Sequence, residues 1–189
     1  MRKQQQIYDL EIPYDDDYKM TEVMERDRAN YESQKIWFYL GADDMNPGFA
    51  KIGITMGDLR SRSYSSANPN YFIFCAFQCR YDTTEEQLKI IERGAKSYLD
   101  SVFCWEDGQT KRVRHRESQQ LSECYYNINF EDFFVELHEY LIDNHYRYFQ
   151  TMGYGFSEDI DEGYALTWEF NPILPAHVQR RFLRMILRG

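Results

Sequence analysis

The sequence predicts a mixed α/β (α+β) fold in which a small three-stranded antiparallel sheet is flanked by helices. Residues 36–55, IWFYLGADDMNPGFAKIGIT, contain two apolar runs around a polar segment with Asn-Pro-Gly, which is typical of a β-hairpin. Residues 71–79, YFIFCAFQC, are almost wholly apolar, as expected of a central strand buried on both faces. Residues 82–102 repeat apolar side chains at helical spacing, which predicts a long helix after the third strand.

The helix predicted over 82–102 carries the clearest local signals. Thr83 and Glu86 match the Ser/Thr-x-x-Glu capping box that begins many helices. The apolar stripe that follows has helical spacing and consists of Leu88, Ile91, Ala95, Leu99 and Val102. A second amphipathic helix is predicted over 128–144, and a basic amphipathic helix after Pro175.

The remaining segments divide the chain into three parts. Residues 1–34 form an acidic N-terminal arm, with a helix near 20–31; residues 35–127 form the core; and residues 128–189 form a helical C-terminal extension. Within these parts we expect a short helix at 57–70, a loop at 106–122 and one late strand at 164–170.

Charge and composition restrict the function classes. The net charge of −9 argues against a protein that coats nucleic acid non-specifically, because that affinity comes mainly from Lys and Arg. Two basic clusters nevertheless interrupt the acidic sequence, at 110–116 and at the C-terminus. Residues 1–10 lack the apolar core of a signal peptide, and no apolar stretch approaches about 20 residues. We therefore expect an intracellular, cytoplasmic protein with no membrane partner.

The four cysteines have no C-x-x-C spacing, and a disulfide framework is not expected in an intracellular chain of this length. Free buried thiols are the favoured interpretation. The alternative is a zinc site that uses Cys75, Cys79, Cys104 and His115, although this spacing fits no common zinc template.

Glu92 is the acidic residue most suggestive of function. At 100° per residue it falls 40° from Leu88, inside the apolar stripe of its helix. A carboxylate in that position must be paired, neutralised or bound to a cation, since an uncompensated buried charge costs several kcal/mol. The alternative is a glutamate at the edge of the stripe whose carboxylate reaches solvent.

The hairpin and this helix together resemble the GIY-YIG nuclease superfamily over residues 35–127. Trp37-Phe38-Tyr39 corresponds to the first motif, and Lys51-Ile52-Gly53 to the second, with Lys in the place of the name-giving Tyr. KIGIT is similar to a branch common in phages and viruses, which has a turn where ANP (67–69) lies and a Glu-Trp-Phe element where SECYYN (122–127) lies. The glycine before Tyr39 is missing.

The resemblance implies a metal-dependent endonuclease that hydrolyses phosphodiester bonds of nucleic acid, with DNA favoured over RNA. Glu92 would hold one Mg²⁺ or Mn²⁺, which accepts oxygen ligands. Tyr39 would orient or deprotonate the attacking water, and Lys51 would supply the positive charge that this phenol needs. Arg60 or its rival Arg62 would clamp the phosphate, and Gly53 would leave room for the phosphate beside the backbone.

The basic cluster at 110–116 is the expected contact for the nucleic acid, through Lys111, Arg112, Arg114 and Arg116, and a homodimer is compatible with this activity. Each residue also has an ordinary interpretation: tyrosine as packing, lysine and arginine as solvated surface charge. Two alternatives therefore stay open. In the first, the chain is a non-catalytic nucleic-acid- or protein-binding regulatory protein on a GIY-YIG-like core. In the second, the acidic arm, residues 1–34, inhibits the core by occupying the basic groove.

Overall fold

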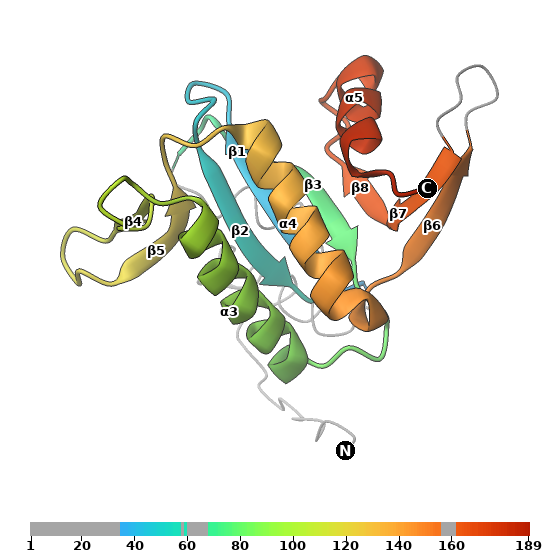
Figure 1. Cartoon of the computed structure of the whole chain (residues 1–189), viewed down its shortest axis with the longest axis horizontal. Coiled ribbons are helices and arrows are strands. Elements are labelled where there is room, and N and C mark those ends of the chain that lie inside the picture. Colours follow the sequence, from blue (N-terminus) through green and yellow to red (C-terminus); the bar gives the residue numbers. More distant parts are fainter. Residues whose placement is uncertain (1–34, 58, 60–67, 156–161) are drawn as a thin grey trace, which may run out of the picture.

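The computed structural model describes residues 35–57, 59, 68–155 and 162–189. Figure 1 shows a twisted antiparallel sheet with two long helices across one of its faces. The elements in chain order are β1 (Trp37–Asp43), β2 (Ala50–Thr55), β3 (Tyr71–Gln78), α3 (Glu85–Val102), β4 (Arg112–Arg114), β5 (Leu121–Tyr125), α4 (Phe130–His145), a 3-10 turn (Tyr146–Tyr148), β6 (Thr151–Gly155), β7 (Glu162–Leu166), β8 (Trp168–Phe170) and α5 (Ala176–Ile186).

The mixed α/β class is confirmed, but the expected number of strands is wrong. The described part of the main sheet has six strands in the order β4-β5-β2-β1-β3-β8, and the three expected strands form its centre. The additional strands are short and partly polar, so their own sequences carry little strand signal. They exist because the edges of the central strands offer unpaired backbone groups that these segments satisfy.

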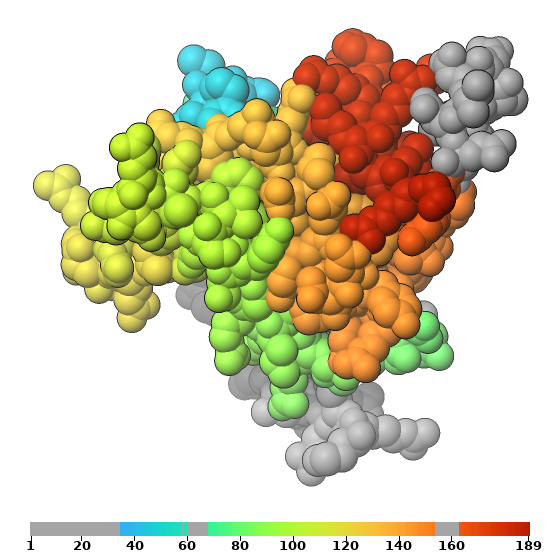
Figure 2. Space-filling view, viewed as in Figure 1, coloured from blue at the N-terminus to red at the C-terminus, as the bar shows by residue number. Residues whose placement is uncertain are grey.

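The polar segment over 106–122 is accordingly not a simple loop. It contains β4 and the first residues of β5, and these two strands pair with each other as an antiparallel hairpin. This hairpin extends from the sheet at the side of α3, as Figures 1 and 2 show in yellow. Its base is fixed where β5 pairs with β2 at Ala50 and Lys51.

The three central strands are held in a defined register. Tyr39 pairs with Gly53 on β2 and with Ala76 on β3, so β1 lies between the other two. The β1–β3 ladder shifts between Leu40 and Gly41, which is a bulge. The β1–β2 turn is closed by short polar contacts, among them Asn46 Oδ1, which accepts from the amide of Gly48 at 3.1 Å.

Helix α3 begins one residue later than the capping signal predicts. Thr84, rather than Thr83, is the N-cap: its hydroxyl accepts from the amide of Gln87 at 3.2 Å, and the Gln87 side chain accepts from the amide of Thr84 at 2.8 Å. Two overlapping Ser/Thr-x-x-Glu/Gln patterns occur here, and Thr83 is used otherwise, since its hydroxyl donates to the carbonyl of Tyr148.

One large core lies between the sheet and helices α3, α4 and α5. It includes fully buried side chains from each layer, for example Phe38 of β1, Leu99 of α3 and Phe134 of α4. Helix α5 packs beside α4 in the space-filling view of Figure 2, with Phe182 buried against Phe134 at 5.2 Å between ring centroids. This aromatic packing explains much of the high aromatic content.

The segment expected to be a helical extension is helical only in part. Helices α4 and α5 are separated by the β6–β7 ribbon and by β8, and β8 joins the main sheet beside β3. The expected strand over 164–170 is divided into β7 and β8. Among the described residues no helix is both long and apolar enough to cross a membrane.

Candidate active site

The alternation of side chains along β1 separates two faces of the sheet. Phe38 and Leu40 belong to the main core with α3 and α4, and we call this side the helix face. Tyr39 belongs to a second, smaller buried cluster, and we call its side the tyrosine face. The buried members of that cluster are Trp37, Tyr39, Ile73 and Ala76, with Leu59 packed against them.

Tyr39 and Gly53 form a matched pair on the tyrosine face. They are opposite each other in the β1–β2 register, and the phenol ring lies directly over the glycine. A Cβ atom at position 53 would lie 2.4 Å from the Tyr39 hydroxyl oxygen and 2.5 Å from Cζ. The clearance over Gly53, expected to admit a phosphate, is therefore filled by the tyrosine ring, and the glycine fixes where that ring lies.

The same arrangement recurs one step along β1. Gly41 is opposite Lys51, and a Cβ atom at position 41 would lie 2.4 Å from the ring of Tyr71. The Lys51 ammonium lies over this ring, 5.5 Å from its centroid, a favourable cation–π geometry. Lys51 thus shares a face with Tyr39, as expected. Its ammonium contacts the ring of Tyr71, a residue that the sequence analysis did not single out.

Glu92 lies on α3 with its carboxylate turned inward, as the helical position predicts. Its side chain is only 15% exposed, and Lys96, one turn later, places its ammonium 3.1 Å from Oε1. The same ammonium lies 3.0 Å from Oε1 of Glu123 on β5. Two carboxylates therefore converge on one cation at the junction of α3 and β5.

Burial and the second carboxylate set the electrostatics at this junction. Burial raises the pKa of Glu92 and the neighbouring Glu123 raises it further, while Lys96 acts in the opposite direction. Two carboxylates close together repel each other unless a positive charge lies between them. The Lys96 ammonium supplies that charge.

The two faces approach each other at the β2–β5 junction. Lys51 of the tyrosine face is the register partner of Cys124, the residue that follows Glu123. The Lys51 charge also lowers the pKa of the Cys124 thiol, although burial raises that pKa more strongly. Helix α3 carries Glu92 on the helix face, whereas Tyr39 lies on the opposite face, so the backbone of β2 separates the carboxylate from the phenol.

The donor set at Glu92 fits a hard divalent cation. Two carboxylate oxygens suit Mg²⁺ or Mn²⁺, which keep several waters when a protein offers few ligands. The described residues contain no group of three or more His, Cys, Asp or Glu side chains suited to hold a metal. The alternative zinc site is therefore not assembled; its cysteines are free thiols, with Cys75 and Cys79 buried in the third strand and its continuation.

The basic cluster divides into anchoring and exposed residues. Arg112, only 12% exposed, pairs with Asp100 of α3 at 2.6 Å. The Asp100 carboxylate also accepts from the hydroxyls of Thr110 at 2.7 Å and Tyr125 at 3.0 Å. This network ties the β4–β5 hairpin to α3, so Arg112 serves the fold and is not an exposed contact for nucleic acid.

The other basic side chains of the hairpin face outward. The Lys111 ammonium lies 5.2 Å from the ring centroid of Trp105, which is 47% exposed. Arg114 donates to the carbonyl of Gln119 at 2.7 Å and is exposed, as is Arg116 in the turn. An exposed aromatic ring beside several cations suits a nucleic-acid strand, since bases stack on rings and phosphates meet cations.

Sequence reasoning missed Lys96 and Tyr71, and it noted Glu123 only as the acid of the SECYYN element (122–127), without a role at the site. Lys96 follows Glu92 by four residues, which is the signal for an ion pair on a helix. Nothing local marks Tyr71, and the SECYYN element does not show that Glu123 meets Lys96, because only the tertiary fold brings β5 and β3 to this place. Arg60 and Arg62, the expected phosphate clamp, lie outside the described residues, as does the acidic arm.

Comparison of the chain with protein-family models, curated proteins and solved structures found no match.

Proposed function

We propose that this chain is a metal-dependent endonuclease of the GIY-YIG type, which hydrolyses phosphodiester bonds in DNA. The observation that carries the proposal is the pair of carboxylates, Glu92 and Glu123, held around a single cation position beside β2. Glu92 is only 15% exposed and Glu123 is 44% exposed, and a half-buried carboxylate beside a second one needs a compensating cation, which the Lys96 ammonium supplies here.

The metal would be held by Glu92, with Glu123 as a second oxygen donor. When bound, Mg²⁺ or Mn²⁺ stabilises the negative charge that develops on the leaving oxygen of the phosphodiester. The remaining ligands would be water and the substrate phosphate. Lys96 must withdraw from between the carboxylates for this to happen, and its flexible stem allows the ammonium to move to the phosphate.

Tyr39 would orient the attacking water and accept its proton, which requires the phosphodiester to reach both faces of the sheet past β2, because the phenol and the Glu92 carboxylate lie on opposite faces. The support is its fixed position: Gly53 holds the ring against β2, and Lys51 lies on the same face of the sheet. A phenol needs nearby positive charge to act as a base near neutral pH, and Lys51 is the closest candidate in the register. Arg60 or Arg62 would complete the site as the phosphate clamp.

The β4–β5 hairpin would hold the DNA. Arg114 and Arg116 supply exposed positive charge, the half-buried Lys111 places its ammonium over Trp105, and Trp105 supplies a ring for base stacking. Arg112 is left out of this surface because Asp100 neutralises it. The negative body of the protein would then limit binding to DNA that reaches this hairpin.

The test is cleavage by the purified full chain of single- and double-stranded DNA and RNA, with and without Mg²⁺ or Mn²⁺. We expect metal-dependent cleavage of DNA that Glu92→Gln strongly reduces but leaves measurable, and that Glu86→Gln, an exposed change on the same helix, retains. Intact substrates in every condition, or equal cleavage by Glu92→Gln, would contradict the proposal.

A second candidate is a non-catalytic regulatory protein that binds nucleic acid or a protein through the same core. The observation that favours it is the Lys96 ammonium, which already neutralises Glu92 and Glu123 without any metal. In this case the chain binds DNA through the β4–β5 hairpin, Glu92→Gln binds equally well, and no cleavage is seen with any metal.

A further inference from the structure

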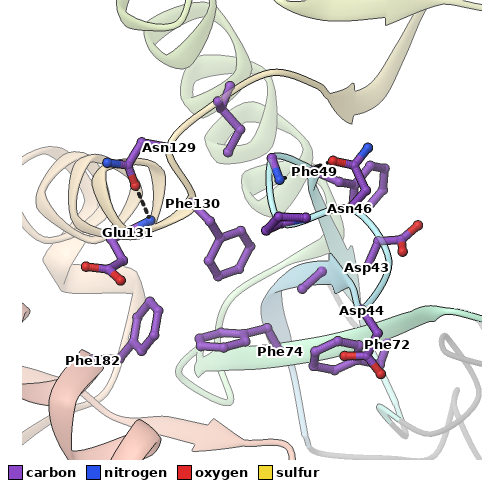
Figure 3. Close-up of a pocket in the computed structure, with 14 residues that line it drawn as sticks. Asp43, Asp44, Asn46, Phe49, Phe72, Phe74, Asn129, Phe130, Glu131 and Phe182 are labelled. Carbon is purple, nitrogen blue, oxygen red and sulfur yellow. Dashed lines mark hydrogen bonds between the residues drawn. The ribbon is translucent and has the colours of Figure 1, made fainter.

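A cavity of about 550 Å³ lies away from the proposed active site, between the β1–β2 turn, β3 and the start of α4. Figure 3 shows that its floor is aromatic, with the rings of Phe182, Phe74 and Phe72 in a row. Ring centroids along this row are separated by 4.7 Å and 6.5 Å. A hollow of this size with an apolar floor is large enough for a small organic ligand.

Carboxylates stand at both ends of this aromatic row. Glu131, in the first turn of α4, lies near Phe182, and Asp44, in the β1–β2 turn, lies near Phe72 (Figure 3). Asp43 also lines the cavity, but its carboxylate is engaged by the amide of Met45 at 2.8 Å and the side-chain amide of Asn68 at 2.6 Å. Within the described residues the Asp44 carboxylate makes no hydrogen bond or ion pair.

The acidic side chains that line this cavity favour a positively charged ligand. Among the described residues that line it there is no Lys or Arg, and Arg181 pairs with the lining residue Glu131. The positive end of the α4 dipole would oppose a cation, but Asn129 Oδ1 already accepts from the Glu131 amide at 3.0 Å, and Glu131 itself offsets that dipole. Phenyl faces attract ammonium groups and also pack against methylene chains.

We propose that this cavity binds an aliphatic polyamine, a methylene chain with ammonium groups at both ends. One terminal ammonium pairs with Asp44 and the other with Glu131, sharing that carboxylate with Arg181. The methylene chain lies along Phe72, Phe74 and Phe182. A compact inorganic cation gains the charge but not the aromatic contact, and a monoamine reaches only one carboxylate.

The experiment is calorimetric titration of the full chain with spermidine at physiological salt, compared with Mg²⁺ and butylamine as probes. We expect one saturable spermidine site, at least tenfold tighter than either probe. Asp44→Asn should weaken it by about two- to fivefold, as expected for one exposed ion pair, and Glu106→Gln, an exposed control elsewhere, should not. Arg181→Gln should tighten it by releasing Glu131.

Two results would overturn the proposal: spermidine binding no tighter than Mg²⁺, or equal binding by Asp44→Asn and Glu106→Gln. Binding of a lysine-rich peptide at this site in preference to spermidine would also overturn it and identify a protein ligand instead. The proposal is independent of nuclease activity, so Glu92→Gln should bind spermidine with unchanged affinity.

Discussion

The helix face and the tyrosine face of the sheet use polar residues in opposite ways. On the helix face, Glu92 and Glu123 share one ammonium at the border of a large apolar core, so charge is compensated locally. On the tyrosine face, two glycines leave space for the rings of Tyr39 and Tyr71, so position is fixed by shape. The β2 strand joins these surfaces, since Lys51 is the register partner of Cys124, the residue that follows Glu123.

This difference teaches that the two halves of the proposed site have different physical origins. The carboxylate half is adjustable, because an ammonium on a flexible stem can move away and a metal can replace it. The phenol half is rigid, because a Cβ at position 53 would overlap the ring. Three changes test these properties separately, and a fourth tests the buried histidine of the helix face; they follow in descending order of expected effect.

Tyr39→Phe should produce the largest effect. Removing the phenol oxygen deletes a proton acceptor while keeping the ring over Gly53, so cleavage should fall about 10²- to 10⁴-fold with little change in melting temperature. The measurement is the single-turnover cleavage rate with Mg²⁺. Tyr146→Phe, a change at an exposed tyrosine, is the control, and an equal rate for the two variants would remove Tyr39 from the chemistry.

His138→Gln should change the pH dependence of stability on the helix face. His138 is fully buried on α4, where Nε2 accepts from the amide of Leu166 at 3.2 Å. Burial, helped by Arg188, lowers the pKa of His138 from 6.5 to about 3. As pH falls below 6.5, the unfolded chain therefore binds a proton at this histidine while the folded protein does not. The free energy of unfolding should fall by about 1.4 kcal/mol per pH unit until the folded pKa is reached.

The free energy of unfolding, measured by urea at pH 7, 6, 5 and 4, checks this expectation. His138→Gln keeps an acceptor for Leu166 but cannot titrate, so the wild-type-minus-variant difference should shrink steadily below pH 6.5. A constant difference for His138→Gln would mean that the buried imidazole takes up a proton without cost.

Gly53→Ala should destabilise the tyrosine face by about 1 to 3 kcal/mol, because its methyl group would overlap a buried ring. The displaced ring should also lower cleavage. Gly153→Ala, where a Cβ would meet nothing within 4 Å, is the matched control and should be nearly neutral. Thermal unfolding measures both, and equal melting temperatures would contradict the tight contact between Tyr39 and Gly53.

Lys96→Met should have the smallest effect, and it should strengthen metal binding, whereas the other changes lower activity or stability. Without the ammonium, Glu92 and Glu123 repel each other, so Mn²⁺ should bind several-fold more tightly in a calorimetric titration. Lys89→Met removes a lysine from an exposed ion pair with Glu85 on the same helix and should leave Mn²⁺ affinity unchanged. Weaker Mn²⁺ binding by Lys96→Met would show that the ammonium does not compete with the metal.

The central part of the fold could be predicted because its signals are long and periodic. The strands at 36–41, 49–54 and 71–79 and the helices at 82–102 and 128–144 agree with β1, β2, β3, α3 and α4 within a few residues. β4, β5 and β8 could not be predicted, since segments such as Arg112–Arg114 become strands only by pairing with a neighbour.

The candidate site could likewise be predicted only where local sequence patterns determine it. The helical position of Glu92 predicted an inward carboxylate with a partner, and its ion pair with Lys96 confirms this. Glu123 and Tyr71 reach the site by tertiary pairing alone, which no local pattern encodes. Arg112 was assigned to nucleic acid from its place in a basic run, because sequence cannot show that Asp100 faces it.

The most direct test of the account is a double-mutant cycle between the two faces, in which metal-dependent cleavage rates are compared for wild type, Tyr39→Phe, Glu92→Gln and the double variant. If both residues act on one phosphodiester, the double variant should lose no more activity than the worse single variant. Losses that multiply, or no cleavage by wild type with any metal, would contradict a single site built from both faces.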